Sequence, residues 1–94
     1  MGYRIYKYEL QITDQQFVEM PAPFEILSVH SQYGQVMMWA KVSVALQGSA
    51  PTQLVRIGVF GTGHDLPDDI ENASFIGTVL TEADQLVWHV WRLP

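Results

Sequence analysis

Apolar and polar residues alternate along most of the chain, with the period of two that is typical of strands with one buried face. The alternation predicts strands over residues 5–12, 17–20, 24–29, 36–44, 54–60, 75–80 and 86–93. Glycine, proline and small polar residues interrupt it at residues 13–16, 31–34, 47–51 and 81–85, where turns or loops are expected. Short strands joined by short turns favour antiparallel pairing. We therefore expect an all-β fold, either an antiparallel sandwich or a small open barrel of about six to seven strands.

The last predicted strand is apolar on both faces. Trp88 and Val90 share one face, and Val87, His89 and Trp91 share the other. A strand of this kind is either central in a two-layer fold or pressed against another subunit. We therefore expect a homo-oligomer, and we expect His89 to be a hydrogen-bonded residue of the core or of an interface.

One helical turn is predicted near residues 68–73. Pro67 precedes Asp68, and Glu71 follows three residues later, which is the spacing of a helix start with Asp68 as the N-cap. Carboxylates in a first helical turn are favoured by the helix dipole, so this acidic cluster needs no metal to explain it.

The size and composition indicate one domain over residues 1–94. The chain has 94 residues, of which 48% are apolar and 16% charged, a proportion suited to a folded core. It has no cysteine, which excludes disulfides and thiolate chemistry. No apolar run resembles a signal peptide or approaches bilayer length, so we expect a soluble cytosolic protein without a membrane partner.

The charge disfavours nucleic acid as a partner. The net charge is −5, whereas phosphate binding requires lysine and arginine. The five cationic residues are scattered one to a segment: Arg4, Lys7, Lys41, Arg56 and Arg92.

Residues 61–64, with the sequence GTGH, are the most conspicuous candidate for a site. As an anion-binding turn, Gly61, Thr62, Gly63 and His64 could direct backbone N–H groups toward a phosphate or carboxylate. The glycine spacing and following lysine of a phosphate-binding loop are missing, as is the third glycine of a dinucleotide fingerprint. As a structural element, the two glycines would allow a bulge that ends the strand and reverses the chain. If the chain binds an anion, Arg56 or Lys7 would complete the site.

Metal binding and catalysis have little support in the sequence. His64 and His89 lack ligand spacing for zinc, and the acids after His64 do not alternate as in a calcium loop. No serine lies in a nucleophile motif. A hydrolase centred on His64 and Asp65 would lack both a nucleophile and a metal set. We therefore expect no cofactor, no metal and no enzymatic activity.

The tryptophans divide between two predicted roles. Trp39 and Trp88 are expected in the core, because a small domain needs large side chains to fill it. Trp91 is equally compatible with the core and with an interface or a stacking wall for a planar ligand.

Three segments together resemble a family of small proteins encoded by tailed bacteriophages and prophages: IYKYEL at residues 5–10, GTGH at residues 61–64 and LVWHV at residues 86–90. In that group an I-W-K-like start precedes a GTGH followed by a proline, and an LVWHV-like strand closes the chain. The similarity runs nearly end to end. Tyr6 replaces the more usual tryptophan, and the proline at Pro67 comes later than in the group. The resemblance implies a phage origin and leaves the mechanism open.

These features favour a non-enzymatic phage accessory protein that acts by binding in the host cytoplasm. Small acidic phage proteins often antagonise host enzymes or defence systems by occupying a protein surface or by sequestering a small anionic ligand. The expected contact residues are Gly61, Thr62, Gly63, His64, Arg56, Lys7 and Trp91. The alternative is a small structural component of the virion or of its assembly.

Overall fold

The computed structural model describes residues 2–44 and 51–94 and confirms the all-β prediction. In these residues the chain forms seven strands and one short 3₁₀ helix. The strands are β1 (Gly2–Leu10), β2 (Gln16–Pro21), β3 (Phe24–Gln32), β4 (Gln35–Val44), β5 (Thr52–Gly61), β6 (Ser74–Thr81) and β7 (Leu86–Arg92), and the helix is η1 (Asp68–Asn72). Of the loop predicted at residues 47–51, only Pro51 lies within the described residues.

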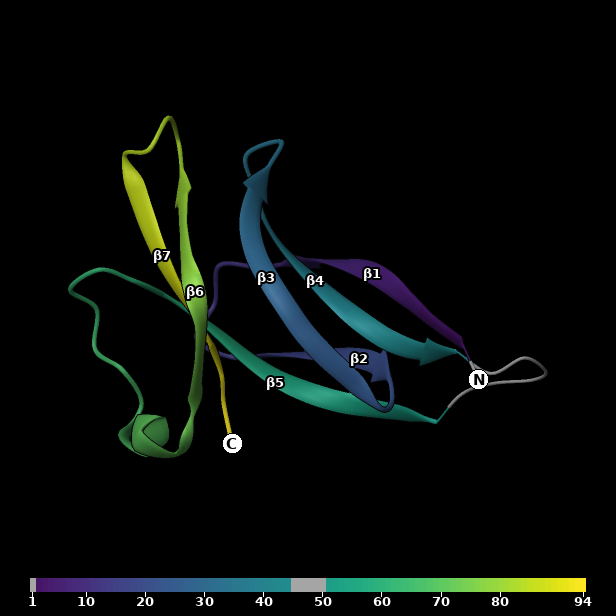
Figure 1. Cartoon of the computed structure of the whole chain (residues 1–94). Coiled ribbons are helices and arrows are strands. Elements are labelled where there is room, and N and C mark those ends of the chain that lie inside the picture. Colours follow the sequence, from purple (N-terminus) through teal and green to yellow (C-terminus); the bar gives the residue numbers. More distant parts are fainter. Residues whose placement is uncertain (1, 45–50) are drawn as a thin grey trace.

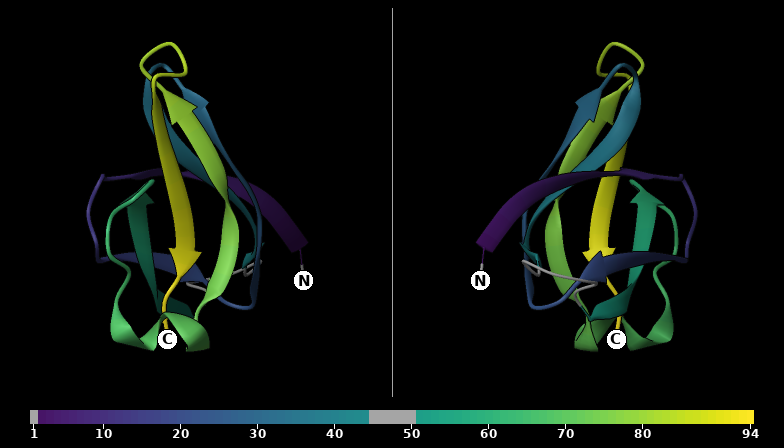
Figure 2. Two further views of the ribbon diagram at one scale, coloured as in Figure 1. Left: turned by 90° about the vertical axis from the view of Figure 1, so that its left-hand side faces the viewer. Right: turned by 90° about the vertical axis from the view of Figure 1, so that its right-hand side faces the viewer.

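The strands form two antiparallel sheets that pack as a sandwich (Figure 1). One sheet has the order β1-β4-β3, and the other has the order β2-β5-β7-β6. The sheets meet most closely where the edge strand β3 lies beside the edge strand β6, and β2 and β6 also contact β4. The left-hand view of Figure 2 shows the β6–β7 hairpin rising beside the β3–β4 hairpin, with β1 crossing behind them. β7 is thus a central strand, one of the two positions that its apolar faces predict.

The core lies between the sheets and is built by the predicted alternation. On β4, Val36, Met38, Ala40 and Val42 are fully buried, and the side chains between them point outward. Facing side chains from the other sheet complete the core, namely Met20, Val55, Ile57, Val59, Val79 and Val90. Each fully buried large aliphatic side chain contributes roughly 1.5–3 kcal/mol, so the core accounts for the stability of the sandwich.

Each of the two adjacent edge strands carries a β-bulge. The β3–β4 register shifts between Ile26 and Ser28, and the β6–β7 register shifts between Phe75 and Gly77. Beyond the bulges the strands approach so closely that a Cβ on Gly77 would lie 2.8 Å from Cγ2 of Val29. The crossing of β3 and β6 therefore requires glycine at this position.

Two local predictions are corrected at the ends of elements. β1 ends at Leu10 rather than at residue 12, because the backbone of Gln11 bonds to the Gln16 side chain instead of to a neighbouring strand. Gln11 N–H donates to Gln16 Oε1 at 3.0 Å, and Gln16 Nε2 donates to the Gln11 carbonyl at 2.8 Å. Asp68 is not an N-cap. Pro67 occupies the cap position in extended geometry, Asp68 is the first residue of η1, and no side chain caps the helix.

Two tryptophans were predicted in the core, and one prediction is wrong. Trp88 is partly buried against the core, and its Nε1 donates to Thr81 Oγ1 at 2.9 Å. Trp39 lies half-buried on the outer face of the β1-β4-β3 sheet, where its ring meets the edge of His30. The reason is the period of the strand: Met38 and Ala40 occupy the inner face, so Trp39 must point outward.

Candidate functional site

Five of the seven predicted contact residues line one surface hollow, here called the corner hollow. They are Gly61, Thr62, Gly63, His64 and Trp91. The hollow has a volume of about 220 Å³, and Phe60, Leu66, Phe75 and His89 complete its lining. It lies on the outer side of the four-stranded sheet, at the end of β5.

The turn that forms one wall of the corner hollow depends on its glycines. β5 stays in register with β7 through the pair Gly61–Trp88, so the strand ends without the bulge that was considered. The His64 N–H then donates to the Gly61 carbonyl at 3.1 Å, and Gly63 has a φ of +88°, which reverses the chain. A Cβ on Gly61 would lie 3.1 Å from the His64 ring and 3.3 Å from the Trp88 ring. The absence of a side chain at Gly61 therefore lets the His64 ring fold back over the strand end.

His89 holds this turn to the sheet, in agreement with its predicted hydrogen-bonded role. Its Nε2 lies 2.8 Å from Thr62 Oγ1, and its Nδ1 lies 3.1 Å from Thr78 Oγ1. A hydroxyl can donate or accept, so both ring nitrogens can be satisfied in either tautomer. These two contacts fix the orientation of the ring and tie the turn at Thr62 to β6.

The opposite wall of the corner hollow is aromatic. Phe75 and Trp91 pack edge to face with their ring centroids 5.1 Å apart. Phe75 is 53% exposed and Leu66 is 43% exposed, so apolar surface faces solvent on this side of the molecule. Trp91 thus forms part of the wall of a surface hollow rather than part of the core.

The two predicted cationic residues do not join the corner hollow. Arg56 is held elsewhere: its Nε donates to Gln15 Oε1 at 2.8 Å, and its Nη1 lies 3.3 Å from Asp69 Oδ2. Lys7 lies on the other sheet, where its Nζ donates to Gln32 Oε1 at 2.7 Å. The lining of the corner hollow contains no lysine or arginine, so the geometry suits an apolar group better than an anion.

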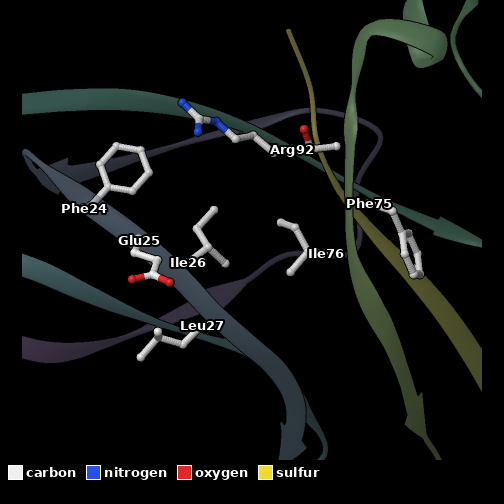
Figure 3. A pocket seen from close by; sticks show the side chains of 8 residues that line it. Phe24, Glu25, Ile26, Leu27, Phe75, Ile76 and Arg92 are labelled. Atoms are coloured by element: carbon white, nitrogen blue, oxygen red, sulfur yellow. The ribbon is translucent and has the colours of Figure 1, made fainter.

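A larger hollow, here called the seam groove, lies between the edge strands β3 and β6 (Figure 3). Its volume is about 390 Å³. Its lining consists of Phe24, Glu25, Ile26, Leu27, Ser74, Phe75, Ile76 and Arg92. The Arg92 guanidinium lies over the Phe24 ring, 5.1 Å from its centroid.

Sequence reasoning missed the seam groove because its two walls are far apart in the chain. Phe24 and Arg92 meet only through the packing of one sheet on the other. One signal was present in the sequence: Arg92 continues the alternation of Trp88 and Val90 and therefore points to the core side of β7. A cation at the end of an otherwise apolar face marks a place where the core opens to solvent.

Within residues 2–44 and 51–94, no three His, Cys, Asp or Glu side chains gather in a way that could hold a metal ion. The part of the chain that the structure describes contains no helix long and apolar enough to cross a membrane.

The fold and the two hollows define the class of this protein as a small all-β sandwich domain with concave surface sites. Over residues 1–94 the chain matches the family described as "Domain of unknown function (DUF7352)", and it belongs to that family. No curated protein and no solved structure matches the chain.

Proposed function

We propose that this chain is a non-enzymatic binding protein that engages a partner protein at the corner hollow. The observation that supports this most directly is the joining of an apolar surface hollow to exposed aromatic and aliphatic side chains, Phe75, Trp91 and Leu66. Protein interfaces are enriched in aromatic residues, and their strongest contacts are large side chains that fill a pocket. A partner would insert one apolar side chain between the aromatic wall and the turn at residues 61–64.

Charge supports a protein partner over the small anionic ligand that was the other expectation. The lining of the corner hollow has histidines as its only titratable side chains. One of them, His89, already uses both ring nitrogens. Anion recognition needs oriented donors with positive charge, whereas an apolar anchor needs only shape and desolvated surface.

The phage resemblance supplies the biological setting of the proposal. The chain acts as a phage-encoded accessory protein in the host cytoplasm, where it blocks a host protein, as counter-defence and host-takeover factors do. A homo-oligomer would present several copies of the corner hollow at once. A structural role in the virion is the alternative, and mass spectrometry of purified particles separates the two, because a virion component is abundant in the particle.

The direct test uses a photo-crosslinking amino acid, benzoylphenylalanine, at Leu66. The matched control places it at Leu54, which is 62% exposed on the outer face of the same sheet and lies outside the lining of the corner hollow. We expect a crosslink to one host protein from position 66 and none from position 54. The crosslinked protein is then purified, and its affinity for the unmodified chain is measured by calorimetry.

Substitutions then assign the contact to the corner hollow. Leu66→Gln places an amide without a partner in the apolar contact and should weaken binding about tenfold or more, because burying such a group costs roughly 1–3 kcal/mol. Leu54→Gln should leave the affinity unchanged. Equal effects of the two substitutions, or a crosslink from position 66 only to a second copy of the chain, would refute the proposed host-protein site.

A further inference from the structure

The seam groove is a second site, built where the edges of the two sheets separate. β3 and β6 are held together where Val29 meets Gly77, and they diverge from there toward Phe24 and Ser74 (Figures 1 and 3). The bulges at Ile26/Ser28 and Phe75/Gly77 lie at the start of this divergence. Bulges bend an edge strand away from its neighbour, so they account for the opening.

Both walls of the seam groove are unpaired strand edges. β3 pairs only with β4, and β6 pairs only with β7, so the edges that face each other belong to no ladder. Among the described residues, no backbone hydrogen bond outside the sheets involves Phe24–Leu27 or Ser74–Ile76. Backbone donors and acceptors along these edges are therefore open to an added strand.

The seam groove holds a cation that has no anionic partner among residues 2–44 and 51–94. Arg92 is half-buried, and its guanidinium lies over the Phe24 ring. The guanidinium makes no hydrogen bond or ion pair to the side chains and backbone that the structure describes. A guanidinium over an aromatic face is attracted to the ring and can still donate two N–H bonds to one carboxylate.

The one carboxylate in the lining does not neutralise Arg92. Glu25 pairs with Lys41 at 3.2 Å, and in Figure 3 its side chain points away from Arg92 on the other side of β3. Ile26 and Ile76 point toward each other and form an apolar floor below the guanidinium (Figure 3). The groove thus combines open strand edges, an apolar floor and one unmatched positive charge.

We propose that the seam groove binds an extended acidic segment of a partner protein, which adds as a strand to the edge of β3 or β6 and pairs a carboxylate with Arg92. Main-chain hydrogen bonds provide affinity in this mode, and alternate side chains provide specificity. One side chain of the segment would lie on Ile26 and Ile76, and the acidic residue two positions away would reach Arg92. The volume of the seam groove, about 390 Å³, lies in the range of ligand-binding pockets in proteins, about 300–1,000 Å³. The two sites share one lining residue, Phe75, whose side chain points away from the seam groove in Figure 3. Arg92, Ile26 and Ile76 lie outside the corner hollow, so failure of this proposal would leave the proposed function untouched.

The test is a nuclear magnetic resonance titration of the isotope-labelled full chain. The probe is the peptide acetyl-Thr-Val-Thr-Glu-Thr-amide, in which valine and glutamate lie two positions apart and share one face of the strand. The controls are the same peptide with glutamine in place of glutamate and sodium acetate alone. We expect amide shifts that gather in residues 24–28 and 74–77 with the glutamate peptide. The glutamine peptide should bind about tenfold more weakly or worse, since a charge-assisted bond is lost. Shifts of the same size with acetate alone would show a simple anion site and overturn the strand-addition proposal.

Two substitutions test the charge of Arg92 in a chain that still folds. Arg92→Met keeps an unbranched stem that can pack on Phe24 while it removes the charge, and it should abolish the preference for glutamate. Arg4→Met removes one charge from the exposed face of β1 and should change nothing at the groove. Retained preference in the Arg92→Met chain, shifts outside the groove, or no shift at millimolar peptide would each overturn the proposal.

Discussion

Gly77→Ala tests the crossing of the two edge strands on which the seam groove depends. The added Cβ would lie 2.8 Å from Val29 Cγ2, about 0.6 Å inside the 3.4 Å at which ordinary contact begins. Gly77 pairs with Val90 directly after the bulge, and its φ lies outside the left-handed region, so alanine meets no penalty of that kind. Two effects on the free energy of unfolding oppose each other. Overpacking in the folded state lowers it by about 1–3 kcal/mol, whereas the smaller conformational entropy of the unfolded chain raises it by about 0.4–1 kcal/mol.

Steric overlap should dominate, and Gly77→Ala should lower the free energy of unfolding by about 1–2 kcal/mol. Urea unfolding followed by tryptophan fluorescence measures this loss, and Tm should fall by about 4–8 °C for each kcal/mol in a domain of this size. Gly2→Ala is the matched control, because its Cβ would lie 3.7 Å from Val44 Cγ2, an ordinary contact. The control should change stability by less than about 0.5 kcal/mol.

A double-mutant cycle identifies the colliding partner. Val29→Ala alone should cost roughly 2 kcal/mol, from two lost methyl groups and the space they leave. In the double variant the new methyl group of residue 77 fills that space, so the combined loss should be smaller than the sum by about 1 kcal/mol or more. Additive losses, or a Gly77→Ala chain as stable as the natural one, would refute the contact between β3 and β6.

Two further predictions concern hydroxyl groups. The Tyr8 hydroxyl is buried without a hydrogen-bond partner among the described residues, and burial, with a smaller effect of Tyr6, raises its pKa above 10.0. Tyr8→Phe should therefore leave the free energy of unfolding at pH 7 unchanged or higher, as urea unfolding measures, and a clear loss would contradict it. Because the pKa of Tyr8 is raised in the folded state, the folded chain keeps the hydroxyl proton to a higher pH than the unfolded chain does. The contribution of the protonated hydroxyl to the free energy of unfolding is therefore complete below pH 10 and is lost as the pH rises through the folded pKa. The Tyr8→Phe chain should lose less stability across that window than the natural chain. Thr62→Val removes the bond to His89 Nε2 and should speed hydrogen exchange in residues 61–64, at a cost of about 0.5–1.5 kcal/mol, whereas Thr78→Val should leave exchange in that turn unchanged. Equal exchange in the two variants would show that the bond does not hold the turn.

The alternation of side chains was sufficient to predict the fold class because burial acts on every second residue of a strand. Val36 and Val42, for instance, could only be buried together if the segment was extended. The positive φ of Gly34 in the β3–β4 turn could also be predicted, since glycine in a short hairpin turn serves this purpose. The predicted N-cap at Asp68 was wrong because proline at the preceding position took the cap geometry.

The candidate site was predictable only in part. Residues 61–64 and Trp91 do share a hollow, but its apolar character comes from Phe75 and Leu66, which no local pattern connects to the turn. Arg56 lies outside this hollow and pairs with Asp69 of η1, a contact that local sequence patterns do not indicate.

The sequence by itself determined which residues are strands, which faces are buried and where the chain reverses, because these depend on neighbours within a few positions. Only the tertiary structure decided which strand edges remain unpaired and which side chains meet across the two sheets. Arg92 illustrates the difference. Its place on β7 follows from alternation, whereas the contact of its guanidinium with Phe24 follows from the packing of β3 against β6. Contacts between distant segments depend on how the sheets are laid on each other, and that arrangement is set by the whole core at once.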